Sequence, residues 1–108
     1  VIAMGVVAEV SAGGYHTCAR KPGGSLWCWG YNGDGQVGDG TLGTKKSPVQ
    51  VTAMGTAVAE VSAGLSHTCA RTTDGTLWCW GTNSDGQLGT GVTTMKQQSP
   101  VTALFSCP

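Results

Sequence analysis

The chain has 108 residues, enough for one domain with a modest core, and 40% of them are hydrophobic. Six basic and six acidic residues give no net charge and form no basic stripe of the kind that binds nucleic-acid phosphates. No apolar stretch approaches the roughly 20 residues of a membrane helix. We therefore expect no nucleic-acid partner and no membrane span. Because the chain does not begin with methionine, we expect a mature product or an excised piece.

The chain contains two copies of one unit. The sequence VSAGGYHTCAR at 10–20 matches VSAGLSHTCAR at 61–71 in nine of eleven positions, and LWCWG occurs at 26–30 and 77–81. Short apolar bursts separated by glycine predict short strands joined by tight turns. A period near 50 residues is typical of β-propeller blades. We predict an all-β fold with two repeats, 1–50 and 51–108, each with four short antiparallel strands, and a short C-terminal tail on the second.

Each repeat contains a hairpin that brings two cysteines together. Residues 22–24 and 73–75 suit three-residue loops that end in a left-handed glycine. With these turns, Cys18 lies opposite Cys28 and Cys69 lies opposite Cys79 at non-hydrogen-bonded positions, where Cα atoms are about 4.5 Å apart. This separation is within the range of a disulfide. We predict both disulfides.

Two other interpretations of these cysteines stay open. Each hairpin offers a possible metal-ligand set, His16 with Cys18 and Cys28, or His67 with Cys69 and Cys79. Neither set has the short cysteine knuckle or the evident fourth ligand of a zinc site. Free structural thiols are the other alternative. The disulfide interpretation implies an oxidising compartment, so we expect a secreted or extracellular protein, with the periplasm and the cell surface as alternatives. Cys107 then has no partner in either hairpin, and we expect it to bond another chain or sequence beyond this piece, or to be left free by truncation.

The tryptophans and histidines are interpreted as blade-packing residues. Trp27 and Trp29 share one face of their strand, and Trp78 and Trp80 repeat the arrangement. Their alternative role is a sugar-binding platform, together with tyrosines such as Tyr15 and Tyr31. His16 and His67 are interpreted as structural residues hydrogen-bonded between strands. The sequence contains no recognisable catalytic constellation, so we expect no enzyme.

The glycine-rich segments at 32–40 and 83–91 resemble calcium loops only in part. The loop positions that need glycine and a bidentate glutamate hold Val37 and Gly43 in the first copy. We interpret both segments as turns, and predict no metal and no cofactor. The loops at 31–46 and 82–98 are expected to present glycine- and threonine-rich surface to a protein partner.

The combined pattern resembles the repeat of the regulator of chromosome condensation family. The V-x-A-G-x-x-H strand, the T-x-D-G turn, the W-G-x-N ending and the G-Q-L-G-x-G loop all occur in residues 61–91. The resemblance extends over nearly the whole chain, twice. It implies a propeller of four-stranded blades, commonly seven. The nucleotide-exchange activity of the founding members is not carried over, because two repeats lack the full ring.

These observations predict a non-enzymatic extracellular structural or protein-binding module. Two blades leave outer faces uncovered, so we expect partners in other copies of the chain or in the rest of a larger propeller. The alternative function is a carbohydrate-binding lectin that uses exposed aromatic residues.

Overall fold

The computed structural model describes residues 6–82 and 96–102, which form two four-stranded antiparallel sheets. The strands pair in sequence order within each sheet, and one 3₁₀ turn, η1, connects the sheets. The first sheet contains β1 (Glu9–Ala12), β2 (His16–Arg20), β3 (Leu26–Gly30) and β4 (Lys45–Gln50), followed by η1 (Thr52–Met54). The second contains β5 (Val58–Ala63), β6 (His67–Thr72), β7 (Leu77–Thr82) and β8 (Lys96–Thr102). The predicted fold class is confirmed.

The local sequence explains why the central hairpins form. Short, alternating stretches rich in tryptophan, threonine and cysteine suit a pleated, half-buried surface. Each pair of central strands is joined by a tight turn that ends in a glycine with positive φ, 94° at Gly24 and 87° at Gly75. This conformation agrees with the left-handed glycine that the turn sequences predict. The turns set the register of β2 on β3 and of β6 on β7.

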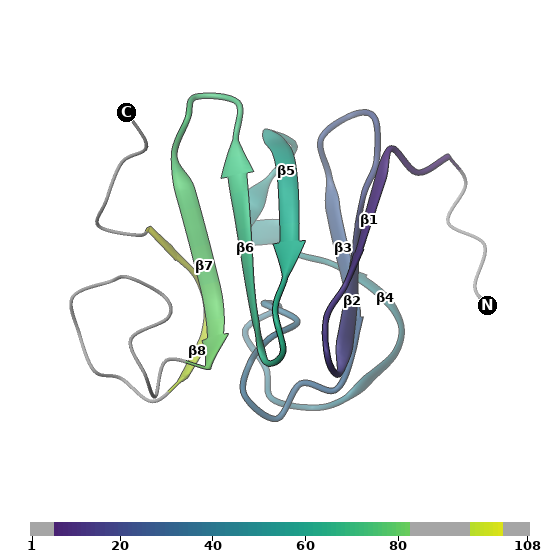
Figure 1. Cartoon of the computed structure of the whole chain (residues 1–108), viewed down its shortest axis with the longest axis vertical. Helices are drawn as coiled ribbons and strands as arrows, with labels where there is room; N and C mark the ends of the chain where they lie inside the picture. Colours follow the sequence, from purple (N-terminus) through teal and green to yellow (C-terminus); the bar gives the residue numbers. More distant parts are fainter. Residues whose placement is uncertain (1–5, 83–95, 103–108) are drawn as a thin grey trace.

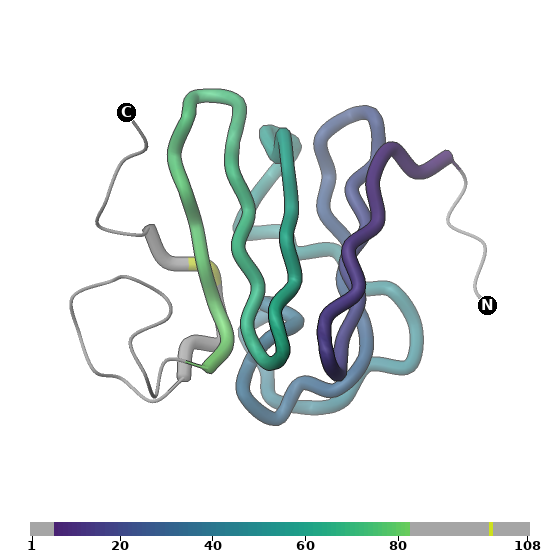
Figure 2. The backbone as a smooth tube through the Cα atoms, viewed as in Figure 1, coloured from purple at the N-terminus to yellow at the C-terminus, as the bar shows by residue number. Residues whose placement is uncertain are grey.

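The two sheets lie side by side, with β5 next to the first sheet (Figure 1). β5 contacts both β1 and β2, although these strands are about one repeat away in the sequence. The chain after β3 runs below β5 and β6 before it returns to form β4 (Figure 2). This segment therefore belongs to the joint between the two repeats. Within the described residues, no helix has the length and apolarity to cross a membrane.

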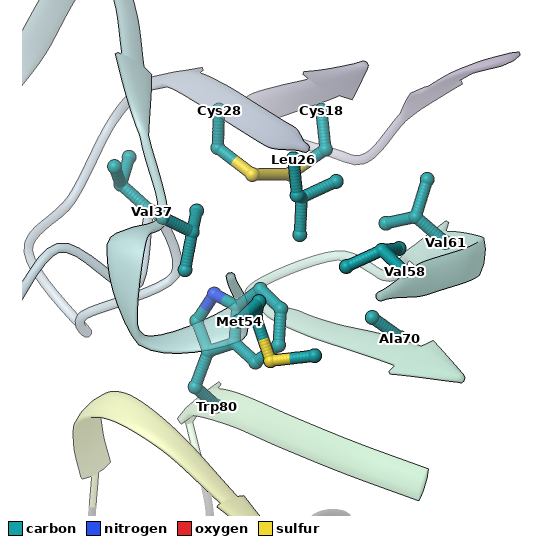
Figure 3. Packing of buried hydrophobic residues seen from close by; sticks show 10 residues of the cluster. Cys18, Leu26, Cys28, Val37, Met54, Val58, Val61, Ala70 and Trp80 are labelled. Carbon is teal, nitrogen blue, oxygen red and sulfur yellow. A yellow bond between two sulfur atoms is a disulfide. The ribbon is translucent and has the colours of Figure 1, made fainter. Parts of the chain in front are cut away.

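The hydrophobic core fills the space between the sheets. Figure 3 shows the Cys18–Cys28 disulfide and Leu26 on one side, with Val61, Ala70 and Trp80 on the other. Residues from the connecting segments complete the cluster: Val37, Val51 and Met54. The first repeat thus presents its cysteine face to the tryptophan face of the second repeat. Counterparts of these two faces lie on the outer sides of the pair.

Candidate functional site

The two cysteine pairs lie in the register that the turns predict. Cys18 is paired with Cys28, and Cys69 with Cys79, in the ladders of their hairpins. The Cα atoms of each pair are 4.1 Å apart, and the structure contains a disulfide at each position. Sulfur atoms held in disulfides are not available as thiolate ligands. Among the described residues, no group of three or more His, Cys, Asp or Glu side chains is arranged to hold a metal ion.

The four tryptophans occupy two different environments. Trp80 is fully buried between the sheets, and the partly buried Trp78 packs against the same core. Trp27 and Trp29 are partly exposed on the outer side of the first sheet. Lys21 covers the Trp27 ring, with its Nζ atom 4.7 Å from the ring centroid. The second-repeat pair therefore fills the joint between repeats, while its first-repeat counterparts lie on the outer side.

His16 links the two repeats through a buried hydrogen bond. Its Nε2 atom lies 2.6 Å from Oγ1 of Thr68. The Thr68 hydroxyl donates to the backbone oxygen of Gln36 at 2.8 Å. Because a hydroxyl has one proton to donate, the Nε2–H of His16 is the donor in the first bond. This hydrogen bond joins β2 to β6.

Burial lowers the pKa values of both histidines. The pKa of His16 falls from 6.5 to about 4, because burial disfavours the charged ring and His67 adds a repulsive charge. Burial also lowers the pKa of His67. Both rings are thus held neutral at pH 7, which favours the structural role that the sequence predicts over a cationic one. Cys107, the remaining predicted site residue, lies outside the described residues.

The expectation that the loop at 31–46 presents its surface to a protein partner is partly wrong. Asn32, Gln36 and Val37 have no exposed surface, and only residues 40–44 form a continuous exposed stretch. The Asn32 side chain accepts a hydrogen bond from the Val37 N–H and donates to the carbonyl oxygens of Thr41 and Gly43. The loop therefore folds around Asn32 and packs against the second repeat. Most of the second loop, 83–95, lies outside the described residues.

Sequence reasoning missed Asn32 as the residue that organises the loop, and Gln36 and Thr68 as residues of the joint between the repeats. The signal available was the recurrence of asparagine and glutamine four residues apart, at 32 and 36 and again at 83 and 87. That spacing matches a side chain that organises a loop rather than a generic turn. It does not reveal where the loop packs, because the partner residues lie about 30 to 45 positions away.

An exposed aromatic patch, the tyrosine edge, consists of Tyr15 and Tyr31. Their exposed fractions are 61% and 50%. The two tyrosine rings meet edge to face, with centroids 6.2 Å apart at 69°, and line a hollow of about 380 Å³. The backbone N–H of Tyr31 donates to the Tyr15 carbonyl at 2.9 Å, which holds the two segments together.

The tyrosine edge is specific to the first repeat. Serine and threonine, Ser66 and Thr82, stand at the positions equivalent to Tyr15 and Tyr31. The Tyr31 ring lies directly over Gly33, where a Cβ atom would collide with it. The second repeat has Ser84 at that position and no ring to accommodate. These differences between the repeats act together to build the aromatic hollow at the first repeat.

Two stacked four-stranded antiparallel sheets, one from each copy of a 51-residue repeat, define a protein built from β-propeller blades. The chain belongs to the Regulator of chromosome condensation (RCC1) repeat family. One family profile matches residues 7–36 and 58–87, and a second matches residues 23–71 and 74–106. The resemblance stated from the sequence is confirmed.

Three proteins are similar to this chain in sequence or in fold. The RCC1 domain-containing protein RUG3, mitochondrial, of Arabidopsis thaliana is 33% identical over 100 residues, 92% of this chain and 22% of the relative. The crystal structure of human WBSCR16 matches with a TM-score of 0.87 and 25% identity, over 97% of this chain and 27% of that one. Prp20p of Saccharomyces cerevisiae, studied for its binding to Gsp1p and histones, matches with a TM-score of 0.85 and 18% identity, over 97% and 27%. The chain thus spans less than a third of each.

Proposed function

We propose that this chain is a non-catalytic protein-binding module made of two propeller blades, and that the tyrosine edge contacts the partner. The observation that carries this proposal is the exposure of two tyrosine side chains around one hollow, where the equivalent positions of the second repeat hold the small polar residues Ser66 and Thr82. Tyrosine is enriched among the residues that dominate binding energy at protein interfaces.

The protein-binding class is supported by the family. Prp20p, which shares the fold, is described by its binding to Gsp1p and histones. Those partners belong to that protein, and we do not transfer them to a chain with 18% identity. The names of RUG3, WBSCR16 and Prp20p give the carbohydrate-binding alternative no support. The remaining blades would come from a longer parent chain or from other copies.

The proposed location is an oxidising compartment, either outside the cell or as oxidising as the extracellular space. The support is the pair of hairpin disulfides, because such bonds persist where glutathione does not reduce them. The comparisons add no support for this location, and RUG3 is named a mitochondrial protein. Fractionation of the source cells, followed by alkylation before any reductant is added, tests it. Recovery of the protein with all four hairpin thiols alkylated would contradict the proposed location.

The binding proposal is tested with the residues that the second repeat already carries. Tyr15→Ser combined with Tyr31→Thr removes the aromatic hollow while using side chains that the equivalent positions tolerate. A partner captured from the native source is identified by cross-linking, and its affinity is then measured by calorimetry. We expect the double variant to weaken binding at least about 30-fold, as expected for loss of an interfacial hot spot. Leu42→Thr, an exposed change in the loop after β3, is the matched control and leaves binding unchanged.

Retention of full affinity by the double variant would place the binding site elsewhere. Saturable binding to a glycan array that the double variant loses would show a lectin instead. The two outcomes are distinguishable because calorimetry uses the purified protein partner and the array contains none.

A further inference from the structure

Three of the hydrogen bonds that cross the joint between the repeats share one spacing in the sequence. The backbone N–H of Val61 donates to the Glu9 carboxylate at 3.3 Å, and that of Ala63 donates to the Ser11 hydroxyl at 2.9 Å. The third is the bond between His16 and Thr68. All three run from β1 and β2 to β5 and β6. The partners of each bond are 52 residues apart, one repeat plus one position.

The groups that the first repeat contributes to this joint recur on the outer side of the second repeat. Glu60, Ser62 and His67 are the sequence counterparts of Glu9, Ser11 and His16, and we call them the second-repeat surface. Glu60 and Ser62 are exposed. The Glu60 carboxylate is held by Arg71 at 3.3 Å, as Glu9 is held by Arg20 at 3.1 Å. The carboxylate is thus already positioned as it is in the occupied joint.

The complementary groups recur on the outer side of the first repeat. Val10, Ala12 and Thr17 are the counterparts of Val61, Ala63 and Thr68, and we call them the first-repeat surface. Val10 is 60% exposed, whereas Val61, covered by the first repeat, is 4% exposed.

Two backbone N–H groups of β1 point in the direction that the same hydrogen bonds require. β1 is an edge strand, and the Gly13 N–H donates to the His16 carbonyl at the end of its ladder with β2. Because N–H groups alternate in direction along an antiparallel strand, those of Ala12 and Val10 point away from β2. The counterparts of these two groups, in Ala63 and Val61, are the ones that bind the first repeat. Within residues 6–82 and 96–102, β1 pairs with no strand other than β2, and an open edge of this kind is a template for association.

We propose that the first-repeat surface of one chain binds the second-repeat surface of a second copy, through the contacts that join the two repeats internally. Glu60 and Ser62 of one copy accept the N–H groups of Val10 and Ala12 of the other, and His67 bonds to Thr17. This inference is independent of the tyrosine edge. It rests on continuity with an interface that the structure contains and on the presence of both halves of that interface in every chain.

Association of this kind is head to tail. Each contact uses two different surfaces, so a pair of copies still has one free surface of each kind. Further copies can therefore add, and the mean mass rises with concentration. The net charge of zero imposes no long-range repulsion between copies.

The test uses two variants that each block one surface. Val10→Arg blocks the first-repeat surface and Ser62→Arg blocks the second-repeat surface, both at exposed positions. All proteins carry Cys107→Ser, so that a disulfide between copies cannot account for association. By sedimentation velocity, the unblocked chain should exceed 11.0 kDa increasingly with concentration, and each blocked variant should remain at 11.0 kDa. An equimolar mixture should form a species of twice that mass and nothing larger, because only one productive contact remains.

A monomeric unblocked chain at high micromolar concentration would overturn the proposal, and would leave both surfaces to neighbouring repeats of a longer protein. A mixture that stays monomeric while the unblocked chain associates would also overturn it. Circular dichroism and unfolding midpoints verify that the variants are folded, and Thr17→Arg with Glu60→Arg is the replacement pair if either is not.

A matched pair of mild variants separates association from folding. Ser62→Ala should weaken association by about fivefold, the loss of one hydrogen bond, with an unchanged unfolding midpoint measured at a concentration where both proteins are monomeric. Ser11→Ala, its counterpart inside the joint, should lower that midpoint and leave the association constant unchanged. Equal effects of the two variants on association would contradict the proposed contacts.

Discussion

Trp80 of the second repeat donates its indole N–H to the backbone carbonyl of Gln36 in the first repeat, over 2.8 Å. Both residues are fully buried, and the same carbonyl also accepts the Thr68 hydroxyl. A loop that follows β3 of one sheet is thereby attached to β6 and β7 of the other. The joint between the repeats consequently depends on a loop conformation as well as on packing between the sheets.

Trp80→Phe should destabilise the chain by roughly 1–3 kcal/mol, because it removes one buried hydrogen bond and part of the core volume. The matched control is Trp27→Phe on the outer side of the first sheet. The Trp27 indole bonds to Ser25 within its own hairpin turn, so we expect a loss below about 1 kcal/mol. Urea denaturation measures both values. Equal losses of stability would show that the buried hydrogen bond and packing of Trp80 contribute no more than the interactions of Trp27.

Gly38→Ala should destabilise the chain by roughly 2–4 kcal/mol. The φ angle of Gly38 is 80°, and a Cβ atom there would collide with the Trp80 ring, so backbone strain and steric overlap act together. Gly43→Ala in the same loop is the control, because no atom lies within 4 Å of a Cβ at that position. Its effect should stay within about 0.5 kcal/mol. If thermal unfolding shows the two variants to be equally stable, the loop does not pack on Trp80 as described.

Stability should fall as the pH is lowered from about 6.5 to about 4. The pKa of His16 is about 4 in the folded chain and 6.5 in the unfolded chain, so the unfolded state binds more protons in this window. The expected loss is on the order of 3 kcal/mol, and it does not grow further below pH 4. The lowered pKa of His67 adds a contribution of the same sign.

His16→Gln should flatten this pH profile, since the amide keeps a donor for Thr68 but does not titrate. His67→Gln, the counterpart change, should flatten it less, because His67 is less buried in the chain than His16. The measurement is the unfolding midpoint in urea at a series of pH values. A His16→Gln variant with the same slope as the parent would rule out His16 as the titrating group.

The two disulfides should contribute unequally to stability. Each closes a loop of about eleven residues, for which the chain-entropy model gives somewhat under roughly 3 kcal/mol. Replacing Cys18 and Cys28 with alanine should cost more than replacing Cys69 and Cys79, because the first pair lies fully buried in the joint and leaves a cavity. Denaturation of the two double variants gives the comparison.

Mass spectrometry tests the disulfides themselves. Alkylation of the denatured, unreduced chain should label Cys107 alone and leave the four hairpin cysteines unlabelled. Labelling of all five without reductant would contradict the predicted bonds, whatever the stability measurements show.

The features that the sequence could predict are those set by residues close together in the chain. The three-residue turns determine which residues of each hairpin face one another, so the register of Cys18 on Cys28 follows from counting alone. The recurrence of the whole pattern after 51 residues predicts two equivalent sheets. Strand pairing between adjacent segments is a local property, and the structure agrees with it.

The tertiary structure alone decided which of two equivalent residues is covered. Val10 and Val61 stand at the same position of their repeats, yet one is 60% exposed and the other 4%. The sequence around Gln36 is typical of a glycine-rich turn. The loop is nevertheless buried, because Thr68 and Trp80 bind it across the joint. Hydrophobic periodicity identifies an apolar face but not the surface that covers it. Which surface covers a face depends on contacts between residues one repeat apart. A repeated sequence contains the residues for both sides of such a contact in each repeat, so the sequence does not show which copies are used.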